Sequence, residues 1–251
     1  MRSNGTLAEP PIGYLVIAER KEICPNCGQT FHTRISITPD KMVVRDRTRC
    51  LCSPTREQEQ AYLVERMNKR VGLYFGQADL LRAPGPTLLG LEPRTGQEQA
   101  IETLRKLCEE THPKRPILLY GPAGRGKTFL ALAFLRELAA KLRLSALAVR
   151  AIDMFAYVRQ DMWNREKPQQ CLTLLRQVDL LLIDDIGAEK VTDSRLEVLY
   201  SIVDYRYDRK TTVFTSNLTG KEMETRLGKP ITSRIWGGVQ VPVTGRDWRI
   251  A

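Results

Sequence analysis

One glycine-rich segment, residues 121–128, constrains this chain more than any other part of its sequence. It reads Gly121-Pro122-Ala123-Gly124-Arg125-Gly126-Lys127-Thr128 and fits the pattern G-x-x-x-x-G-K-[ST] of phosphate-binding loops. The apolar run 116–120 precedes it, as expected of a buried parallel strand, and residues 129–142 follow it without a Gly or Pro to break a helix. Strand, loop and helix start together predict an anion site, because backbone N–H groups and the helix dipole point at the phosphates.

The residue types in this phosphate loop predict their roles. Lys127 is expected to reach the β- and γ-phosphates of a nucleotide, and the Thr128 hydroxyl is expected to bind Mg²⁺. The remaining nucleotide-binding positions are Gly121, Pro122, Ala123, Gly124, Arg125, Gly126 and Phe129. A glycine-rich turn that binds nothing is the alternative, and the flanking strand and helix patterns disfavour it.

A second motif, residues 180–185, places two carboxylates directly after an apolar run. The run Leu180-Leu181-Leu182-Ile183 is typical of a buried parallel strand, whose carboxyl end lies at the same sheet edge as the phosphate loop. Asp184 is expected to hold Mg²⁺, and Asp185 occupies the position of the acid that activates water. An apolar run ending in Asp is common by itself, but its position after a phosphate loop favours this Walker B interpretation.

Further elements follow in an order that matters for the chemistry. Residues 192–209 are predicted to be helical, and residues 211–217 form a strand ending at Asn217, whose amide could orient the attacking water. Pro230 can start a short helix that contains Arg234 and stops at a Gly pair. Residues 95–98 and 219–222 both fit the helix-starting capping box, in which a Thr precedes a Glu by three positions.

Four of the six cysteines lie in one short segment, as Cys24, Cys27, Cys50 and Cys52. Such clustering predicts a zinc site rather than disulfides, since four thiolates complete a closed tetrahedral site. His32 is an alternative fourth ligand. Residues 31–37 and 41–45 are expected to form a hairpin between the cysteine pairs, which gives a small zinc-ribbon-like module that depends on metal for folding.

The 251 residues are expected to divide into a zinc-binding module (1–53), a connecting helix and linker (54–86), and a nucleotide-binding domain (87–251). No apolar run approaches the roughly 20 residues of a membrane span, and a cytoplasmic protein is expected. The net charge of +10 suits a polyanion such as nucleic acid, although a basic but unspecialised surface is the alternative. Residues 153–169 mix aromatics with cations. They either stack on bases or form an amphipathic helix whose aromatics face the core.

The order of these motifs looks like that of an AAA+ ATPase. More closely, residues from about 90 to 251 resemble the DnaC/DnaI helicase loaders and the related IstB transposition helpers. The resemblance rests on residues 182–187, 215–218, 233–235 and 245–249. The cysteine-rich module resembles the DnaI arrangement, in which such a module contacts the replicative helicase.

The resemblance implies an α/β fold, namely an AAA+ parallel-sheet sandwich with a small N-terminal zinc-ribbon-like module. It implies that Asn217 is sensor 1, that Arg234 is an arginine finger acting on a neighbouring subunit's ATP, and that Arg249 resembles sensor 2. A salt bridge on the helix surface is the alternative role for Arg234. Asp185 replaces the Glu of many AAA+ proteins, so slow hydrolysis is expected. The chain stops two residues past Arg249, so no C-terminal helical lid is expected.

The resemblance therefore implies an ATP-dependent helicase loader that uses ATP, Mg²⁺ and Zn²⁺. Its expected partners are a hexameric replicative helicase, single-stranded DNA and further copies of itself in a spiral or hexamer. Two alternatives remain open: an IstB-type transposition ATPase that binds duplex DNA, and an adaptor that binds ATP without hydrolysing it.

Overall fold

A computed structural model of the chain describes residues 10, 15–23, 28, 30–39, 43–47, 56–110, 113–158, 166–188, 192–248 and 250. The chain divides into two compact units, Met1–Leu63 and Val64–Ala251, which we describe separately. Among the described residues, we find no helix of the length and apolarity that crossing a membrane would require.

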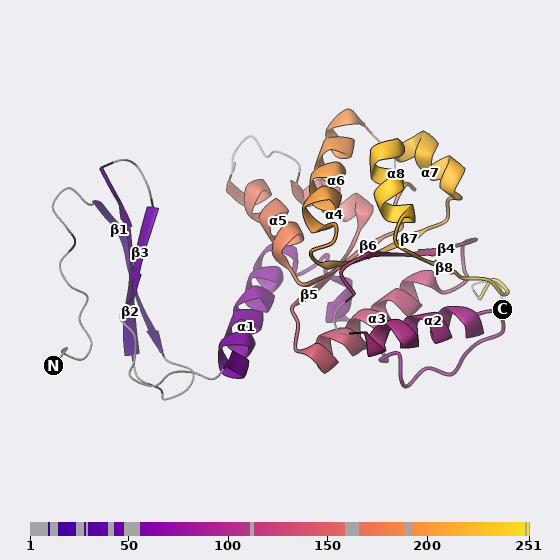
Figure 1. Cartoon of the computed structure of the whole chain (residues 1–251), viewed down its shortest axis with the longest axis horizontal. Helices are drawn as coiled ribbons and strands as arrows, with labels where there is room; N and C mark the ends of the chain where they lie inside the picture. Colours follow the sequence, from indigo (N-terminus) through magenta and orange to yellow (C-terminus); the bar gives the residue numbers. More distant parts are fainter. Residues whose placement is uncertain are drawn as a thin grey trace. The chain divides into compact units, whose positions relative to one another are not determined.

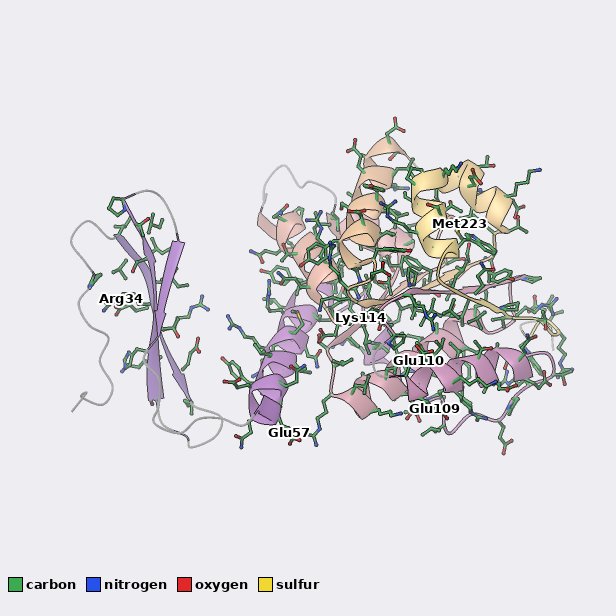
Figure 2. All side chains as sticks on the ribbon, viewed as in Figure 1. Arg34, Glu57, Glu109, Glu110, Lys114 and Met223 are labelled. Carbon is green, nitrogen blue, oxygen red and sulfur yellow. The ribbon has the colours of Figure 1, made fainter. Side chains whose placement is uncertain are left out.

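The N-terminal unit contains a three-stranded antiparallel sheet in the order β1-β2-β3. Its strands are β1 (Leu15–Ile23), β2 (Thr30–Ile37) and β3 (Val43–Arg47). The predicted hairpin is confirmed, with β2 paired to β3 from Thr33–Arg47 to Ile37–Val43. Strand β1 pairs with β2 from Leu15–Ile37 to Ile23–Thr30, and Arg34 of β2, labelled in Figure 2, forms an ion pair with Glu19 of β1.

The C-terminal unit contains a five-stranded parallel sheet in the order β5-β6-β7-β4-β8 (Figure 1). Its strands are β4 (Pro116–Tyr120), β5 (Ala146–Arg150), β6 (Leu180–Asp184), β7 (Thr211–Ser216) and β8 (Val239–Pro242). The strands expected at residues 116–120, 180–183 and 211–217 are present as β4, β6 and β7. The α/β fold class is thereby confirmed.

Helices cover both faces of this sheet (Figure 1). One face carries α2 (Glu98–Glu109) and α3 (Lys127–Leu142). The other carries α4 (Ala151–Val158), α5 (Glu166–Gln177), α6 (Asp193–Arg206), α7 (Gly220–Leu227), α8 (Lys229–Trp236) and the later part of α1 (Arg56–Phe75). Strand residues alternate between two buried clusters: Leu118 and Leu181 face one, while Ile117 and Leu182 face the other. Side chains fill both layers, among them that of Met223 on α7 (Figure 2).

Helix starts were predicted with mixed success. The capping box at residues 219–222 is confirmed, because the Thr219 and Glu222 side chains each bond the other's backbone N–H. The capping box at residues 95–98 is wrong. Helix α2 begins at Glu98, its N-cap is Gln97 without a side-chain cap, and the Glu98 carboxylate accepts a bond from Gly96 N–H instead.

The aromatic residues of segment 153–169 that the structure describes belong to the core. Phe155 is buried, and the Tyr157 ring packs against Phe75 with 5.1 Å between centroids. Trp163 and the two arginines beside it, Arg159 and Arg165, lie outside the described residues. The core interpretation therefore holds for Phe155 and Tyr157.

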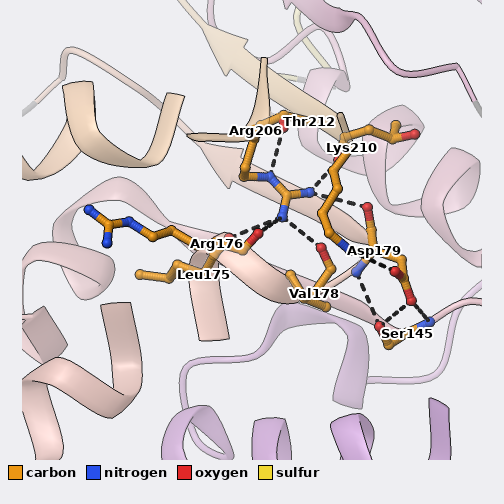
Figure 3. Close-up of polar contacts among 9 residues, drawn as sticks. Ser145, Leu175, Arg176, Val178, Asp179, Arg206, Lys210 and Thr212 are labelled. Carbon is orange, nitrogen blue, oxygen red and sulfur yellow. Dashed lines mark hydrogen bonds and ion pairs between the residues drawn. The ribbon is translucent and has the colours of Figure 1, made fainter. Parts of the chain in front are cut away.

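A buried arginine, Arg206, ties several elements together at the edge of the sheet where β6 and β7 begin (Figure 3). Its guanidinium donates hydrogen bonds to one hydroxyl and to five carbonyl groups, those of Thr212 (Oγ1), Leu175, Arg176, Val178, Asp179 and Thr211. Burial lowers the pKa of Arg206 to about 9. Because three of the carbonyls lie at the end of α5, the cation also suits the negative end of that helix dipole.

Candidate functional site

The parallel topology brings three separate segments to one edge of the sheet. Strands β6, β7 and β4 are neighbours and run in the same direction, so the residues after each strand meet at their carboxyl ends. These residues are the phosphate loop after β4, Asp184 and Asp185 at the end of β6, and Asn217 after β7. Ligand sites in open parallel sheets form at this edge.

The phosphate loop has a backbone that only its glycines allow. Gly124 and Gly126 have φ angles of 75° and 88°, in the left-handed region, and Gly126 is the N-cap of α3. A Cβ added to Gly126 would lie 2.6 Å from Nε2 of Gln97. The loop is therefore closely backed by another part of the chain.

Gln97 supplies that backing, and the sequence did not reveal it. Its side chain is buried, and its Nε2 donates a 2.7 Å hydrogen bond to the Arg125 carbonyl within the loop. The capping-box interpretation placed residue 97 inside a helix start with no side-chain role. Gln97 lies just outside the apolar pattern of α2, and nothing in a single sequence indicates that such a polar residue bonds to a distant loop.

Lys127 lies within the phosphate loop and is almost fully buried. Its Nζ donates hydrogen bonds of 2.8 Å to the carbonyls of both Gly121 and Pro122, and of 2.6 Å to Oδ1 of Asn217. The ammonium group is therefore held by acceptors from the loop itself and from the residue that follows β7. The sequence did not predict this direct bond between the loop lysine and the residue after β7.

Asp184 is buried between two threonine hydroxyls. Its Oδ1 accepts hydrogen bonds of 2.7 Å from Thr128 and 2.6 Å from Thr215. Burial raises the pKa of Asp184 and the Asp185 charge adds to the rise, while the bonds from Thr215 and Thr128 oppose it. These hydroxyl and carboxylate oxygens are the ligands Mg²⁺ prefers, and a cation would offset the desolvation of the carboxylate. The donor set fits the expected ion.

Asp185 is exposed, in contrast to its neighbour, and has a left-handed φ of 56°. Its backbone N–H donates a 2.8 Å bond to Oγ1 of Thr215, and its Oδ1 accepts a 3.0 Å bond from Nδ2 of Asn217. The Asn217 amide thus bridges Lys127 and Asp185, with its oxygen on the cation and its nitrogen on the anion. A carboxylate, an amide and an ammonium group are therefore linked by hydrogen bonds at the carboxyl ends of β6 and β7 and the start of α3.

The C-terminal residues 244–248 also contact the loop. The Trp248 N–H donates a 3.1 Å bond to the Gly124 carbonyl, and a Cβ on Gly124 would lie 1.8 Å from the Asp247 carboxylate. The Trp248 ring lies 4.8 Å from the Arg94 guanidinium carbon and 4.1 Å from that of Arg246. The motif was predicted to act through Arg249, which lies outside the described residues. Its neighbours Asp247 and Trp248 contact the loop, and the role of Arg249 stays a prediction.

Arg234 lies on α8 and makes its bonds to α6 and to its own helix. Its Nη2 forms a 2.8 Å ion pair with Asp204 and lies 3.3 Å from the Tyr200 hydroxyl, while Nη1 donates a 2.9 Å bond to the Pro230 carbonyl. None of these contacts involves the phosphate loop or Asp184. The salt bridge that was the alternative role is therefore present, and action on another subunit's nucleotide stays a prediction.

The predicted zinc ligands, Cys24, Cys27, Cys50 and Cys52, lie outside the described residues. Among the residues that are described, no group of three or more His, Cys, Asp or Glu side chains could hold a metal ion. His32 lies within β2, opposite Lys21 of β1. Zinc binding stays a prediction from the cysteine spacing.

A comparison with protein families identifies the domain. The model of IstB-like ATP binding proteins matches residues 92–235, which is more than half of the chain. The chain belongs to the IstB-like ATP-binding protein family. The ligand of this site is accordingly ATP, with Mg²⁺ as the ion that Thr128 and Asp184 would hold.

Curated relatives of this IstB-like protein include replication and transposition proteins. The chain is 27% identical over 206 residues to the replicative helicase loader DnaI of Bacillus subtilis, covering 81% of this chain but 64% of DnaI. It is 29% identical over 169 residues to the replicative helicase loader DnaC of Escherichia coli, covering 61% and 68% of the two chains. An IS232 putative ATP-binding protein from Bacillus thuringiensis is 26% identical over 168 residues, covering 63% and 64%.

A solved structure agrees with this assignment. The crystal structure of DnaI superposes with a TM-score of 0.54 and 28% identity, and covers 66% of this chain and 90% of that one. The IstB-like protein thus has the AAA+ sheet and helix arrangement that its motif order indicated.

Proposed function

We propose that this IstB-like protein is an ATP-dependent loader of a replicative DNA helicase. One observation carries the choice of loader. The alignment with DnaI extends over 206 residues, which is longer than the domain formed by residues 87–251, so the similarity reaches into the N-terminal part of the chain. If only the nucleotide-binding domain were similar to DnaI, the alignment would be expected to end within that domain.

The chemistry we propose is hydrolysis of ATP. Asp185 accepts a proton from a water molecule oriented by Asn217, and the water oxygen forms a bond to the γ-phosphorus. The bond from the γ-phosphorus to the bridging oxygen breaks, and ADP leaves. Lys127 neutralises phosphate charge, and the bound Mg²⁺ would shield the β- and γ-oxygens.

Two features of the proposal concern other molecules. Arg234 acts on the ATP of a neighbouring subunit, so the protein works as a self-assembled spiral or hexamer that grips single-stranded DNA. The N-terminal module, with zinc on its four cysteines, contacts the hexameric helicase. Hydrolysis releases the loader. The short Asp185 side chain and the need for assembly make turnover slow in the isolated protein.

The proposal is tested by ATP turnover of the wild type and Arg234→Ala, without DNA, with single strands or with duplex. A replicative helicase hexamer is added in a parallel series. We expect stimulation by single strands and a loss of activity in Arg234→Ala of roughly a hundredfold or more, since an arginine finger typically contributes 10³–10⁵. If Arg234→Ala hydrolysed ATP as fast as the wild type, the proposal of an active site shared between subunits would be contradicted.

A transposition helper is the second candidate, supported by the IS232 relative and by the family model itself. It predicts stimulation by duplex DNA instead of single strands. A non-hydrolysing adaptor predicts ATP binding without turnover in every arm of the same experiment.

A further inference from the structure

We propose that Asp204 and Tyr200 of α6 are positioning residues that orient the Arg234 guanidinium for a neighbouring subunit's ATP. This inference rests on the proposed function, which assigns Arg234 to a shared site. The two α6 residues have no other role in the site described above.

Three contacts fix the position of the guanidinium. Asp204 accepts the 2.8 Å ion pair from Nη2, and the Tyr200 hydroxyl lies 3.3 Å from the same nitrogen. The ring of Tyr200 lies 5.0 Å from the guanidinium carbon, within range of a cation–π contact. The Pro230 carbonyl, one helical turn before Arg234, accepts the bond from Nη1. The group is therefore held from α6 on one side and from α8 on the other.

These contacts leave donors available for a phosphate. A guanidinium has five N–H groups, and the bonds above involve only Nη1 and Nη2. The Arg234 side chain also keeps 28% of its surface exposed. A phosphoryl oxygen from a second copy can therefore bind while Asp204 and Tyr200 stay in place. An arginine ordered in advance loses less conformational freedom when the subunits meet, which favours the transition state.

Because the Asp204–Arg234 ion pair is exposed to solvent, positioning of Arg234 can be distinguished from a contribution to folding stability. The Asp204 side chain is 49% exposed, and ion pairs screened in this way add little to folding stability. Removal of Asp204 should therefore lower turnover and leave thermal unfolding unchanged.

The chain offers a matched control in Asp208. It lines the same surface hollow as Asp204 and Arg234, and the structure shows no bond between Asp208 and Arg234. Asp208 has a φ of 56°, which Asn also tolerates, so Asp208→Asn removes the same charge without backbone strain.

The experiment compares ATP turnover at saturating protein and single-stranded DNA for Asp204→Ala, Tyr200→Ala, Asp208→Asn and Arg234→Ala. We expect kcat to fall about tenfold in Asp204→Ala and Tyr200→Ala, with KM for ATP and the melting temperature unchanged. Asp204→Asn keeps a hydrogen-bond acceptor and should recover part of the loss. Asp208→Asn should match the wild type.

The double variant Asp204→Ala with Arg234→Ala decides whether Asp204 acts through Arg234. We expect it to equal Arg234→Ala alone, because a positioning residue has no effect once its target is gone. A further loss in the double variant, or faster turnover in Asp204→Ala than in the wild type, would overturn the inference while leaving the proposed function intact. If Arg234→Ala itself turns over normally, the shared site fails and this inference fails with it.

Discussion

At the scale of single residues, the site contains a buried carboxylate, that of Asp184, whose burial is unfavourable for folding. Asp184 is a carboxylate buried under two threonine hydroxyls, and burial is the largest influence on its pKa. Because that pKa is raised above its ordinary 3.8, the native state holds the proton to higher pH than the unfolded chain does. Stability must therefore fall as pH rises through this window, and the ionised carboxylate is destabilising at neutral pH.

We predict that Asp184→Asn stabilises the nucleotide-free protein and abolishes Mg²⁺-dependent turnover. The Asn oxygen can accept the same two hydroxyl bonds without the buried charge. Tm at pH 7 should rise by about 2–4 °C, which corresponds to roughly 1 kcal/mol in a protein of this size. The gain over wild type should shrink as pH falls and Asp184 takes up a proton, since its pKa is raised by burial. A variant that melts below the wild type at pH 7 would contradict this account.

The support that Gln97 gives to the phosphate loop leads to a second prediction. Gln97→Met removes the hydrogen bond to the Arg125 carbonyl, and the affinity for ATP should fall roughly fivefold, since such a bond contributes about 1 kcal/mol. Equilibrium titration with a fluorescent ATP analogue measures this loss. Gln99→Met, on the exposed side of α2, is the matched control and should bind as the wild type does.

At the scale of elements, the sheet depends on contacts that join segments distant in sequence. Arg206 connects the end of α5 to the start of β7. The hydrogen bonds of its guanidinium go to carbonyl and hydroxyl groups, and none of these acceptors is a carboxylate. Replacement leaves five carbonyls and one hydroxyl without their donor, and each buried unsatisfied group costs about 1–3 kcal/mol. Relief of the buried charge offsets part of this loss.

We therefore expect Arg206→Met to lower the free energy of unfolding by roughly 3 kcal/mol or more, measured by urea denaturation. Arg206→Lys should fall between Met and wild type, because an ammonium group has three donors. Arg209→Met, an exposed neighbour, should stay within about 0.5 kcal/mol of the wild type. Equal losses at positions 206 and 209 would show that the buried network has no special role.

The sequence predicted elements better than it predicted contacts between them. The strands β4 and β6 were found because buried parallel strands are continuous apolar runs, and the loop and carboxylates were found because their chemistry restricts residue type. The backing by Gln97, the contact of Trp248 with Gly124 and the network of Arg206 were missed. Each is a polar contact across a long sequence separation, and neither periodicity nor local spacing carries information about it.

At the scale of the whole molecule, the nucleotide site lies within one of the two compact units of the chain. The phosphate loop, Asp184 and Asn217 all belong to the unit Val64–Ala251, while the four clustered cysteines belong to Met1–Leu63. No residue of the nucleotide site described above comes from the N-terminal unit. Replacement of the clustered cysteines, the proposed zinc ligands, should therefore leave nucleotide binding intact.

We predict that Cys24→Ser with Cys27→Ser abolishes zinc binding and helicase binding without changing the affinity for ATP. Elemental analysis of the purified protein, which should give one zinc per wild-type chain, measures the first effect. Pull-down of a helicase hexamer and titration with nucleotide measure the others. A wild-type protein that contains no zinc would refute the assignment of the cysteines.

Self-assembly gives the last prediction at this scale. Lys127→Ala and Arg234→Ala should each be inactive alone, but a mixture should regain part of the wild-type turnover. An Arg234→Ala subunit can bind ATP, and a Lys127→Ala neighbour can supply the arginine. No recovery at any mixing ratio would indicate that each subunit hydrolyses ATP by itself.

The left-handed backbone at Asp185 also bears on how such a protein can evolve. Asp and Glu codons differ by a single base, so a longer acid at this position is always one mutation away. A φ of 56° is tolerated by Asp far better than by most other residues with a side chain. The left-handed backbone of the turn after β6 therefore favours Asp over a longer acid at position 185. A change to Glu at this position would also have to tolerate that backbone conformation.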